Sequence, residues 1–433
     1  MSTRDRLFST SSRFELVMHD SGMVGRYDYD TGEEVEVVPG IGDIPPPIPP
    51  PTPIPPPGHL RELMVEADTF RESGPEYKRF NWTGATSFGL IHQVMSSQER
   101  SNGWLDFFAA RRFNILRYVA GIQNSWLSLT PSDALNNLHR AITAASVRGL
   151  RSQVVAISDA AVLYGNRDDV RHHVMEVAEI CNAHTSSVLE IANEPAHPVH
   201  GELLEPEFLR DLRMEVQDRH PRMLVSDGTS PEDEDTSAYT GDYIVRHLDR
   251  NRDPFNNVRR VKNLWYDVQA HLGAPVINNE MTGADEQDSY GDRISEPWFF
   301  FAQGALQALF GVGGNFHSQA GLMADFTLLG PHHTACADAF IEGMETRTPE
   351  NHGRGSYKNV GHTGGPIVEA KFHELGQGDV IKAYSMVTGN RARTVVLHVG
   401  ENLQDEDITV GGGWMIIQEK SKYPGVTLIE SAF

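Results

Sequence analysis

The sequence predicts an α/β protein built as a (β/α)₈ TIM barrel. From about residue 78 to residue 345, short apolar runs of strand length alternate with longer segments of helical periodicity. Eight such pairs follow one another over roughly 270 residues, the usual size of that barrel. Several of the strands are apolar throughout, which is typical of parallel strands covered on both faces. A doubly wound open sheet is the alternative, but no Gly-rich phosphate loop follows the first strand.

The eight pairs can be placed in order along the chain. Strands are expected at 80–90, 114–121, 152–158, 187–195, 222–228, 242–249, 274–280 and 312–318. Helices are expected at 102–113, 131–150, 168–184, 205–220, 257–273, 296–311 and 332–347, and only the short acidic segment 231–239 follows the fifth strand. The second of these helices begins with Pro-Ser-Asp, a typical start for a helix.

The barrel, expected over 59–350, is flanked by two regions of different character. Residues 1–44 alternate as strands do and predict a small β module, too short to bury a core alone. Residues 45–58 form a proline-rich linker, with ten prolines in thirteen positions at 45–57. Such a segment adopts a stiff polyproline II rod. Residues 365–433 contain four or more short strands and predict a C-terminal β-sandwich-like domain.

Composition narrows the classes of partner. The net charge of −22 and pI near 5.2 argue against nucleic acid or an anionic membrane surface, since both attract basic proteins. No apolar run approaches the ~20 residues that span a bilayer, and the first residues lack the apolar core of a secretory signal. The two cysteines, Cys181 and Cys336, are expected to be buried free thiols in separate helices.

Two glutamates follow the expected fourth and seventh strands. Asn193, Glu194 and Pro195 end the first of these, and Pro195 cannot extend a sheet ladder. Glu280 ends the other. Active sites of barrels lie at the carboxyl ends of the strands, so both side chains are predicted to meet in one cleft. Two carboxyl groups about 5 Å apart can cleave a glycosidic bond, one as nucleophile and one as acid and then base. The alternative is that each is a solvated loop charge.

With these residues placed, the chain resembles clan A of the glycoside hydrolases, most closely family 5. The resemblance covers residues of about 78 to 345 and implies a retaining enzyme without metal or organic cofactor. It implies that Glu194 is the general acid/base and Glu280 the nucleophile. It further implies that Asn193 binds the sugar 2-hydroxyl and that Arg117, on the second strand, lies beneath the nucleophile. An ordinary ion pair at the barrel end is the other interpretation of Arg117.

The resemblance also suggests residues that contact the sugar. His247 on the sixth strand is similar to a histidine of many clan members, but Leu248 follows it where those enzymes often have tyrosine. The eighth strand offers Phe316 and His317 where a tryptophan platform is usual. Aromatic rings stack on pyranose faces, so the candidate platforms elsewhere are Trp82, Trp126 and Trp298. Each of these residues could instead belong to the core.

Histidine is abundant, with 19 in the chain, yet the metal-binding patterns are missing. There is no His-Glu-x-x-His and no His-x-His after the first strand. The pairs His172-His173 and His332-His333 fall in or beside expected helices and are interpreted as surface residues. No metal or cofactor is predicted.

The sequence therefore predicts a retaining glycoside hydrolase that cleaves a β-linked glycan. The alternative is a non-catalytic glycan-binding or structural protein of an assembly, built on a glycosidase-like barrel. The stiff linker adds the hypothesis that residues 1–44 dock to another protein or a larger particle, such as a virion carrying a depolymerase. Localisation, the glycan and its linkage are not specified by the sequence.

Overall fold

The computed structural model of the protein describes residues 60–228, 241–247, 274–281, 283–284 and 296–347, together with strands on either side of this region. Residues Met1–Ile54 with Asn124–Ser128 form one compact unit, and the rest of the chain forms a second. The first unit contains a four-stranded antiparallel sheet of sequential strands: β1 (Asp5–Ser9), β2 (Phe14–Met18), β3 (Val24–Asp28) and β4 (Glu34–Glu36).

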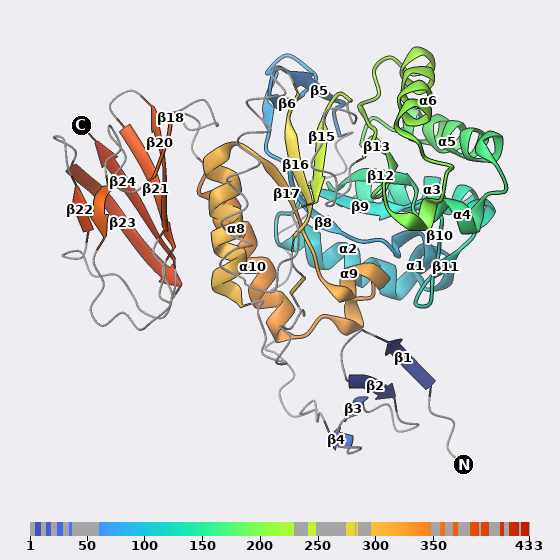
Figure 1. Ribbon diagram of the computed structural model, residues 1–433, viewed down its shortest axis with the longest axis horizontal. Helices are drawn as coiled ribbons and strands as arrows, with labels where there is room; N and C mark the ends of the chain where they lie inside the picture. The colour runs from blue at the N-terminus through green and yellow to red at the C-terminus, as the bar shows by residue number, and fades with distance from the viewer. Residues whose placement is uncertain are drawn as a thin grey trace. The chain divides into compact units, whose positions relative to one another are not determined.

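The second unit contains an eight-stranded parallel sheet that is nearly closed into a barrel (Figure 1). Its strands in chain order are β8 (Thr83–Thr86), β9 (Ile115–Val119), β12 (Arg151–Ile157), β13 (Ser187–Ala192), β14 (Val225–Ser226), β15 (Ile244–His247), β16 (Val276–Glu280) and β17 (Gly313–Phe316). The first strand pairs with the second and with the eighth, as closure of a barrel requires. In the described residues β14 and β15 are the two ends of this sheet, and an antiparallel bridge joins Ser226 of β14 to Gly241, which precedes β15. The barrel is thus confirmed, and the doubly wound sheet is excluded.

Helices follow most strands where the periodicity predicts them. They are α1 (Leu90–Ser96), α2 (Gln98–Ala110), α3 (Pro131–Ser146), α4 (Ala160–Leu163), α5 (Arg167–Asn182), α6 (Pro206–Arg219), α8 (Pro297–Phe310), α9 (Gln319–Met323) and α10 (Pro331–Glu345), with 3₁₀ turns η1 (Pro198–His200) and η3 (Phe326–Leu328). Side-chain caps fix several starts: Thr130 accepts from the Asp133 amide at α3, and Asn166 accepts from the first amides of α5. The expected helix at 257–273 and the acidic segment at 231–239 lie outside the described residues.

An antiparallel sheet, which the sequence did not predict, packs against the amino ends of the barrel strands. It comprises β5 (Leu63–Glu66), β6 (Thr69–Glu72) and β7 (Arg79–Phe80). Phe70 packs against Trp82 and Tyr243, with ring centroids 5.1 and 5.9 Å apart. Arg151 at the start of β12 donates to Glu72 at 2.6 Å. This apolar cluster fills the end of the barrel opposite the carboxyl ends of the strands.

A second apolar layer lies between the sheet and the helices. Phe316 of β17 packs against Phe300 of α8 with ring centroids 5.2 Å apart, and against Phe113 and Phe340. Gly304 lies at the crossing of α8 and α10, where an added Cβ would be 2.5 Å from the carbonyl oxygen of Phe340. Only glycine permits this close approach of the two helix backbones.

Further β structure follows the barrel. Strands β18 (Ser356–Asn359), β20 (Lys382–Thr388), β21 (Arg391–Leu397), β24 (Val426–Ala432) and β23 (Met415–Tyr423) form a five-stranded antiparallel sheet, and β19 (Ile367–Ala370) pairs with β22 (Ile408–Val410). These extra sheets agree with the expected β-rich C-terminal region.

Two further features of the described residues bear on the sequence expectations. Cys181 in α5 and Cys336 in α10 are buried thiols that form no disulfide, as predicted. None of the helices in the described ranges is long and apolar enough to span a bilayer. The proline-rich linker lies outside the described residues.

Candidate active site

An irregular register in β16 turns Glu280 into the barrel. Ile277 pairs with Val245 and belongs to the interior core. Strict alternation would then place Asn279 inside and Glu280 outside. The pairing with β15 instead skips Asn279, so that Glu280 lies opposite His247. Such an extra residue re-aims the side chains that follow it, and both Asn279 and Glu280 contact groups inside the barrel.

Glu194 is placed by a tight turn after β13. Its φ of +45° lies in the left-handed region, which is rare for a residue other than glycine. Such conformations cost about 1–3 kcal/mol and cluster at functional sites. The turn is closed by the His197 amide, which donates to the Glu194 carbonyl at 2.8 Å. The Glu194 side chain then reaches His247, where Oε1 and the ring Nδ1 share a hydrogen bond of 3.0 Å.

Arg117 on β9 links the two strand ends from below. Its Nη1 donates to Glu280 at 2.8 Å, and its Nη2 donates to the Asn193 side-chain oxygen at 2.7 Å. Its Nε and Nη2 donate to the two oxygens of Glu190 at 2.9 and 2.8 Å. Burial opposes the charge of Arg117, but the ion pairs with Glu190 and then Glu280 outweigh burial and raise its pKa above the usual value. Arg117 is therefore a permanent buried cation beside Glu280.

A polar network extends from Arg117 down the inside of the barrel. Gln153 and Asn279 each donate to Glu190 at 2.7 Å. Asn315 donates to Asn279 at 2.9 Å and accepts from the indole N–H of Trp82 at 2.9 Å. Every one of these side chains is buried, and the bonds supply the partners that buried polar groups require.

The backbone of Asn193 is also held from the neighbouring loop. His200 on η1 donates from Nε2 to the Asn193 carbonyl at 2.7 Å, while its Nδ1 accepts from the Ala160 amide at 3.3 Å. This pattern requires a neutral ring with the proton on Nε2. Burial accordingly lowers the pKa of His200 to about 4. Gly228 packs against the Ala192 backbone on the other side, where no Cβ could fit.

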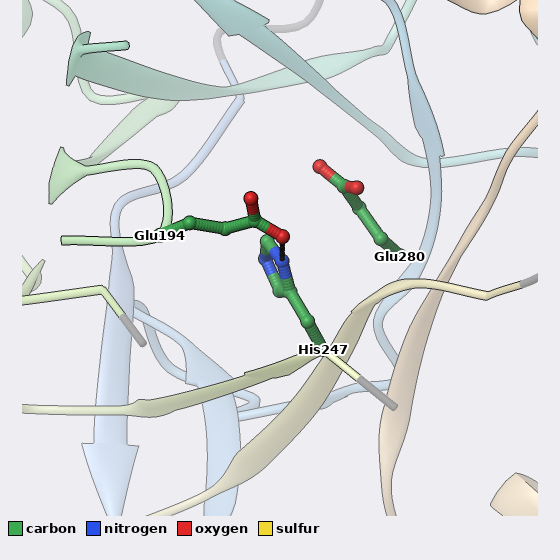
Figure 2. Close-up of side chains that lie close together, drawn as sticks. All are labelled: Glu194, His247 and Glu280. Carbon is green, nitrogen blue, oxygen red and sulfur yellow. Dashed lines mark hydrogen bonds and ion pairs between the residues drawn. The ribbon is translucent and has the colours of Figure 1, made fainter. Parts of the chain in front are cut away.

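Glu194, His247 and Glu280 converge at the carboxyl ends of three strands (Figure 2). One oxygen of each carboxylate and one ring nitrogen of His247 all lie within 4.8 Å of one another. Two acids and a histidine are also a donor set for a divalent cation. However, Arg117 occupies one oxygen of Glu280 and adds a positive charge there, which opposes a cation. The arrangement is better suited to chemistry between two carboxyl groups.

Two of the remaining predicted site residues, Trp82 and Phe316, pack elsewhere. Trp82 is 1% exposed at the start of β8, in the core at the opposite end of the barrel. Phe316 faces the helices. Trp126 lies half-buried in the turn between β10 (Ile122–Gln123) and β11 (Ser128–Leu129), and Trp298 is half-buried in the first turn of α8.

His317 directly follows β17 and is 1% exposed. Its carbonyl accepts from the Ala284 amide at 3.1 Å and joins the loops that follow β16 and β17. His317 is thus at the correct end of the barrel. Neither Trp82 nor Phe316 is therefore placed to act as the platform that the resemblance suggests.

Sequence reasoning missed the residues beneath the site, chiefly Glu190, Gln153, Asn279 and Asn315. A signal was present for Glu190, because a carboxylate inside an otherwise apolar strand must find a cation or several donors. Arg117, likewise charged and within a strand, was its evident partner. The partner atoms of Asn279 and Asn315 depend on the barrel's cross-section, which spacing in sequence does not give.

Comparison with known proteins supports the fold. No family model and no curated protein matches the sequence. Among solved structures, a family 5 glycoside hydrolase from Bacteroides vulgatus is 13% identical, with a TM-score of 0.54, over 86% of this chain and 92% of its own. A candidate glycoside hydrolase from the same bacterium is 12% identical, with a TM-score of 0.55, over 95% and 88%.

A family 5 mannosidase from Rhizomucor miehei is 11% identical, with a TM-score of 0.51, over 66% of this chain and 98% of its own. At such low identity the similarity concerns the fold. The resemblance expected from the sequence is confirmed at that level: the chain has the barrel fold of the family 5 glycoside hydrolases.

Proposed function

We propose that the protein is a retaining glycoside hydrolase acting on a β-linked glycan. The observation that carries the proposal is the approach of Glu194 and Glu280, whose nearest oxygens lie within 4.8 Å. Retaining glycosidases place their carboxyl groups about 5–5.5 Å apart, whereas inverting enzymes need about 6.5–9.5 Å to admit a water. The short separation supports direct attack by one carboxylate on the sugar.

In this proposal Glu280 is the nucleophile, because Arg117 stabilises its ionised form. A Glu280 oxygen bonds to the anomeric carbon as the glycosidic C–O bond breaks, and Glu194 gives its proton to the departing oxygen. A water then transfers a proton to Glu194 and bonds to the anomeric carbon. The ester bond breaks and Glu280 regains its charge.

Two neighbours support these roles. The Asn193 side-chain oxygen accepts from Arg117, so its amide nitrogen is left to donate, and a sugar 2-hydroxyl is a suitable acceptor. His247 shares a hydrogen bond with the Glu194 carboxyl and thereby fixes its position. We propose that both contact the sugar or the acid/base directly, while Arg117 acts beneath the nucleophile.

The test is hydrolysis of a panel of β-linked glycans, with the anomeric form of the first product followed by proton NMR. We expect the β-anomer to appear first. We expect Glu280→Gln and Glu194→Gln each to lower kcat by at least about 10²-fold, while Glu207→Gln, at an exposed position of α6, changes nothing. An α-anomer first would refute retention. Binding without cleavage of any glycan would instead favour the non-catalytic glycan-binding protein.

The proline-rich linker supports a further part of the proposal. Residues 45–57 contain ten prolines, and such a sequence favours a stiff spacer of roughly 40 Å. We propose that residues 1–44 tether the enzyme to a larger particle such as a virion. A fusion of residues 1–58 to a fluorescent reporter should co-sediment with that particle, whereas residues 45–58 alone should not. If neither fusion co-sediments, the tether is refuted.

A further inference from the structure

Glu190 is a fully buried carboxylate that the proposed reaction does not use. It lies on β13 four residues before Glu194, and its side chain has no solvent exposure. Four donors bond to it: two nitrogens of Arg117 and the amides of Gln153 and Asn279, at 2.7–2.9 Å. A buried carboxylate with this many donors is held in one orientation.

Glu190 completes the charge balance around Arg117. The cation faces Glu190 from β13 and Glu280 from β16, with the Asn193 oxygen beside them and the Phe88 ring 5.0 Å away. Glu280 in turn faces Arg117, Glu194 and His247. Glu190 forms a bidentate ion pair with Arg117, whereas Glu280 accepts a hydrogen bond from Arg117 Nη1.

The charge of Glu280 disappears during the proposed reaction, since its oxygen becomes part of an ester. Arg117 would then be a buried cation with no carboxylate, which is strongly unfavourable. With Glu190 in place the cation stays paired in both states. Glu190 also lowers the field that Arg117 exerts on Glu280, so that Glu280 is less strongly held as an anion and remains able to form the ester.

We propose that Glu190 is a positioning residue that serves as the permanent counterion of Arg117, so that the Arg117–Glu280 bond can break and re-form as the glycosyl ester forms and is hydrolysed. This inference rests on the proposed function. It assigns to the network beneath the site a role in the reaction as well as in the fold.

The test is the pH dependence of kcat/KM for Glu190→Gln, which keeps the shape and removes the charge. Two charges that share one guanidinium couple by about one to two pH units at an effective dielectric constant of about 20. In Glu190→Gln we therefore expect the acid limb of the kcat/KM profile to move to lower pH by about that amount. We also expect kcat to fall at least tenfold. The matched control is Glu72→Gln, which breaks the Arg151 pair at the other end of the barrel. It should lower the melting temperature and leave the acid limb in place.

A second variant covers the case in which Glu190→Gln does not fold. Glu190→Asp keeps the charge but is too short to hold both nitrogens of Arg117. We expect kcat to fall at least tenfold with KM within threefold and the acid limb unmoved. An unmoved limb in Glu190→Gln, or wild-type kcat in Glu190→Asp, overturns the proposal while the active wild type leaves the hydrolase assignment intact. A wild type that cleaves no glycan is instead a failure of the proposed function.

Discussion

Arg117→Lys is the sharpest test of how the site is built. The arginine makes four hydrogen bonds to three side chains, two of them buried carboxylates. A lysine ammonium has three donors at one point and cannot span Glu190 and Glu280 together. At least one charge-assisted bond is lost, each worth about 1.5–3 kcal/mol. We expect the free energy of unfolding to fall by about 3 kcal/mol and kcat/KM to fall about 10²-fold.

The measurements are urea unfolding at pH 7 and steady-state kinetics on the best substrate. Arg148→Lys is the matched control, because Arg148 also bonds to a carboxylate, a side-chain amide and a backbone carbonyl, but its carboxylate partner Asp106 is exposed. Exposed pairs contribute about 0–1 kcal/mol. Equal losses of stability in the two variants would show that the buried network contributes nothing beyond a surface ion pair.

Three further predictions follow from buried groups. His173, expected on the surface from the sequence, is instead buried against the Ala156 carbonyl. Burial lowers the pKa values of His173 and His200 to about 4. Since the unfolded chain binds these protons near pH 6.5, urea unfolding should show constant stability above that pH and a loss approaching about 3 kcal/mol per histidine as pH falls towards 4. A flat profile for the His173→Gln, His200→Gln double variant is the expected control, and an unchanged slope would contradict the assignment. Gly304→Leu should lower the melting temperature by several degrees through the α8–α10 crossing, and a wild-type value would rule out that close contact. Trp82→Phe removes the donor to Asn315 and should lower stability by about 1–2 kcal/mol with KM within threefold; a large rise in KM would restore Trp82 as a sugar platform.

Much of the fold was predictable because each barrel strand is a local signal. The strands around Val154, Ile191 and Ile277 are buried along their whole length and contain consecutive apolar residues, which is typical of strands covered on both faces. The sequence also predicts helix starts such as the one at Pro131, which Thr130 caps. The sheet of β5, β6 and β7 was missed because its strands have four residues or fewer and its packing partners lie far along the chain.

The site was predictable only in part, for a different physical reason. Glu194 and Glu280 stand at the ends of strands, and the parallel arrangement brings strand ends together whatever the intervening sequence. Trp82 is also near a strand, but at its amino end, which puts it on the far side of the barrel. The end of the strand at which a residue lies, rather than its type, decides whether it reaches the site. The left-handed turn at Glu194 and the irregular register at Asn279 have no signal in composition.

The irregular register of β16 has a consequence for how this strand can change. One extra residue lets two successive side chains point inward. Asn279 therefore bonds to Glu190 within the barrel, while Glu280 lies at the carboxyl end of the strand and accepts from Arg117. Deleting one residue there would restore simple alternation; the carboxylate would still point into the barrel, but the strand would lose the second inward side chain, the one that bonds to Glu190. The extra residue is therefore what allows β16 to supply two inward polar groups in succession. A grafted or designed version of this barrel must copy the count of residues between Ile277 and Glu280 before it copies their chemistry.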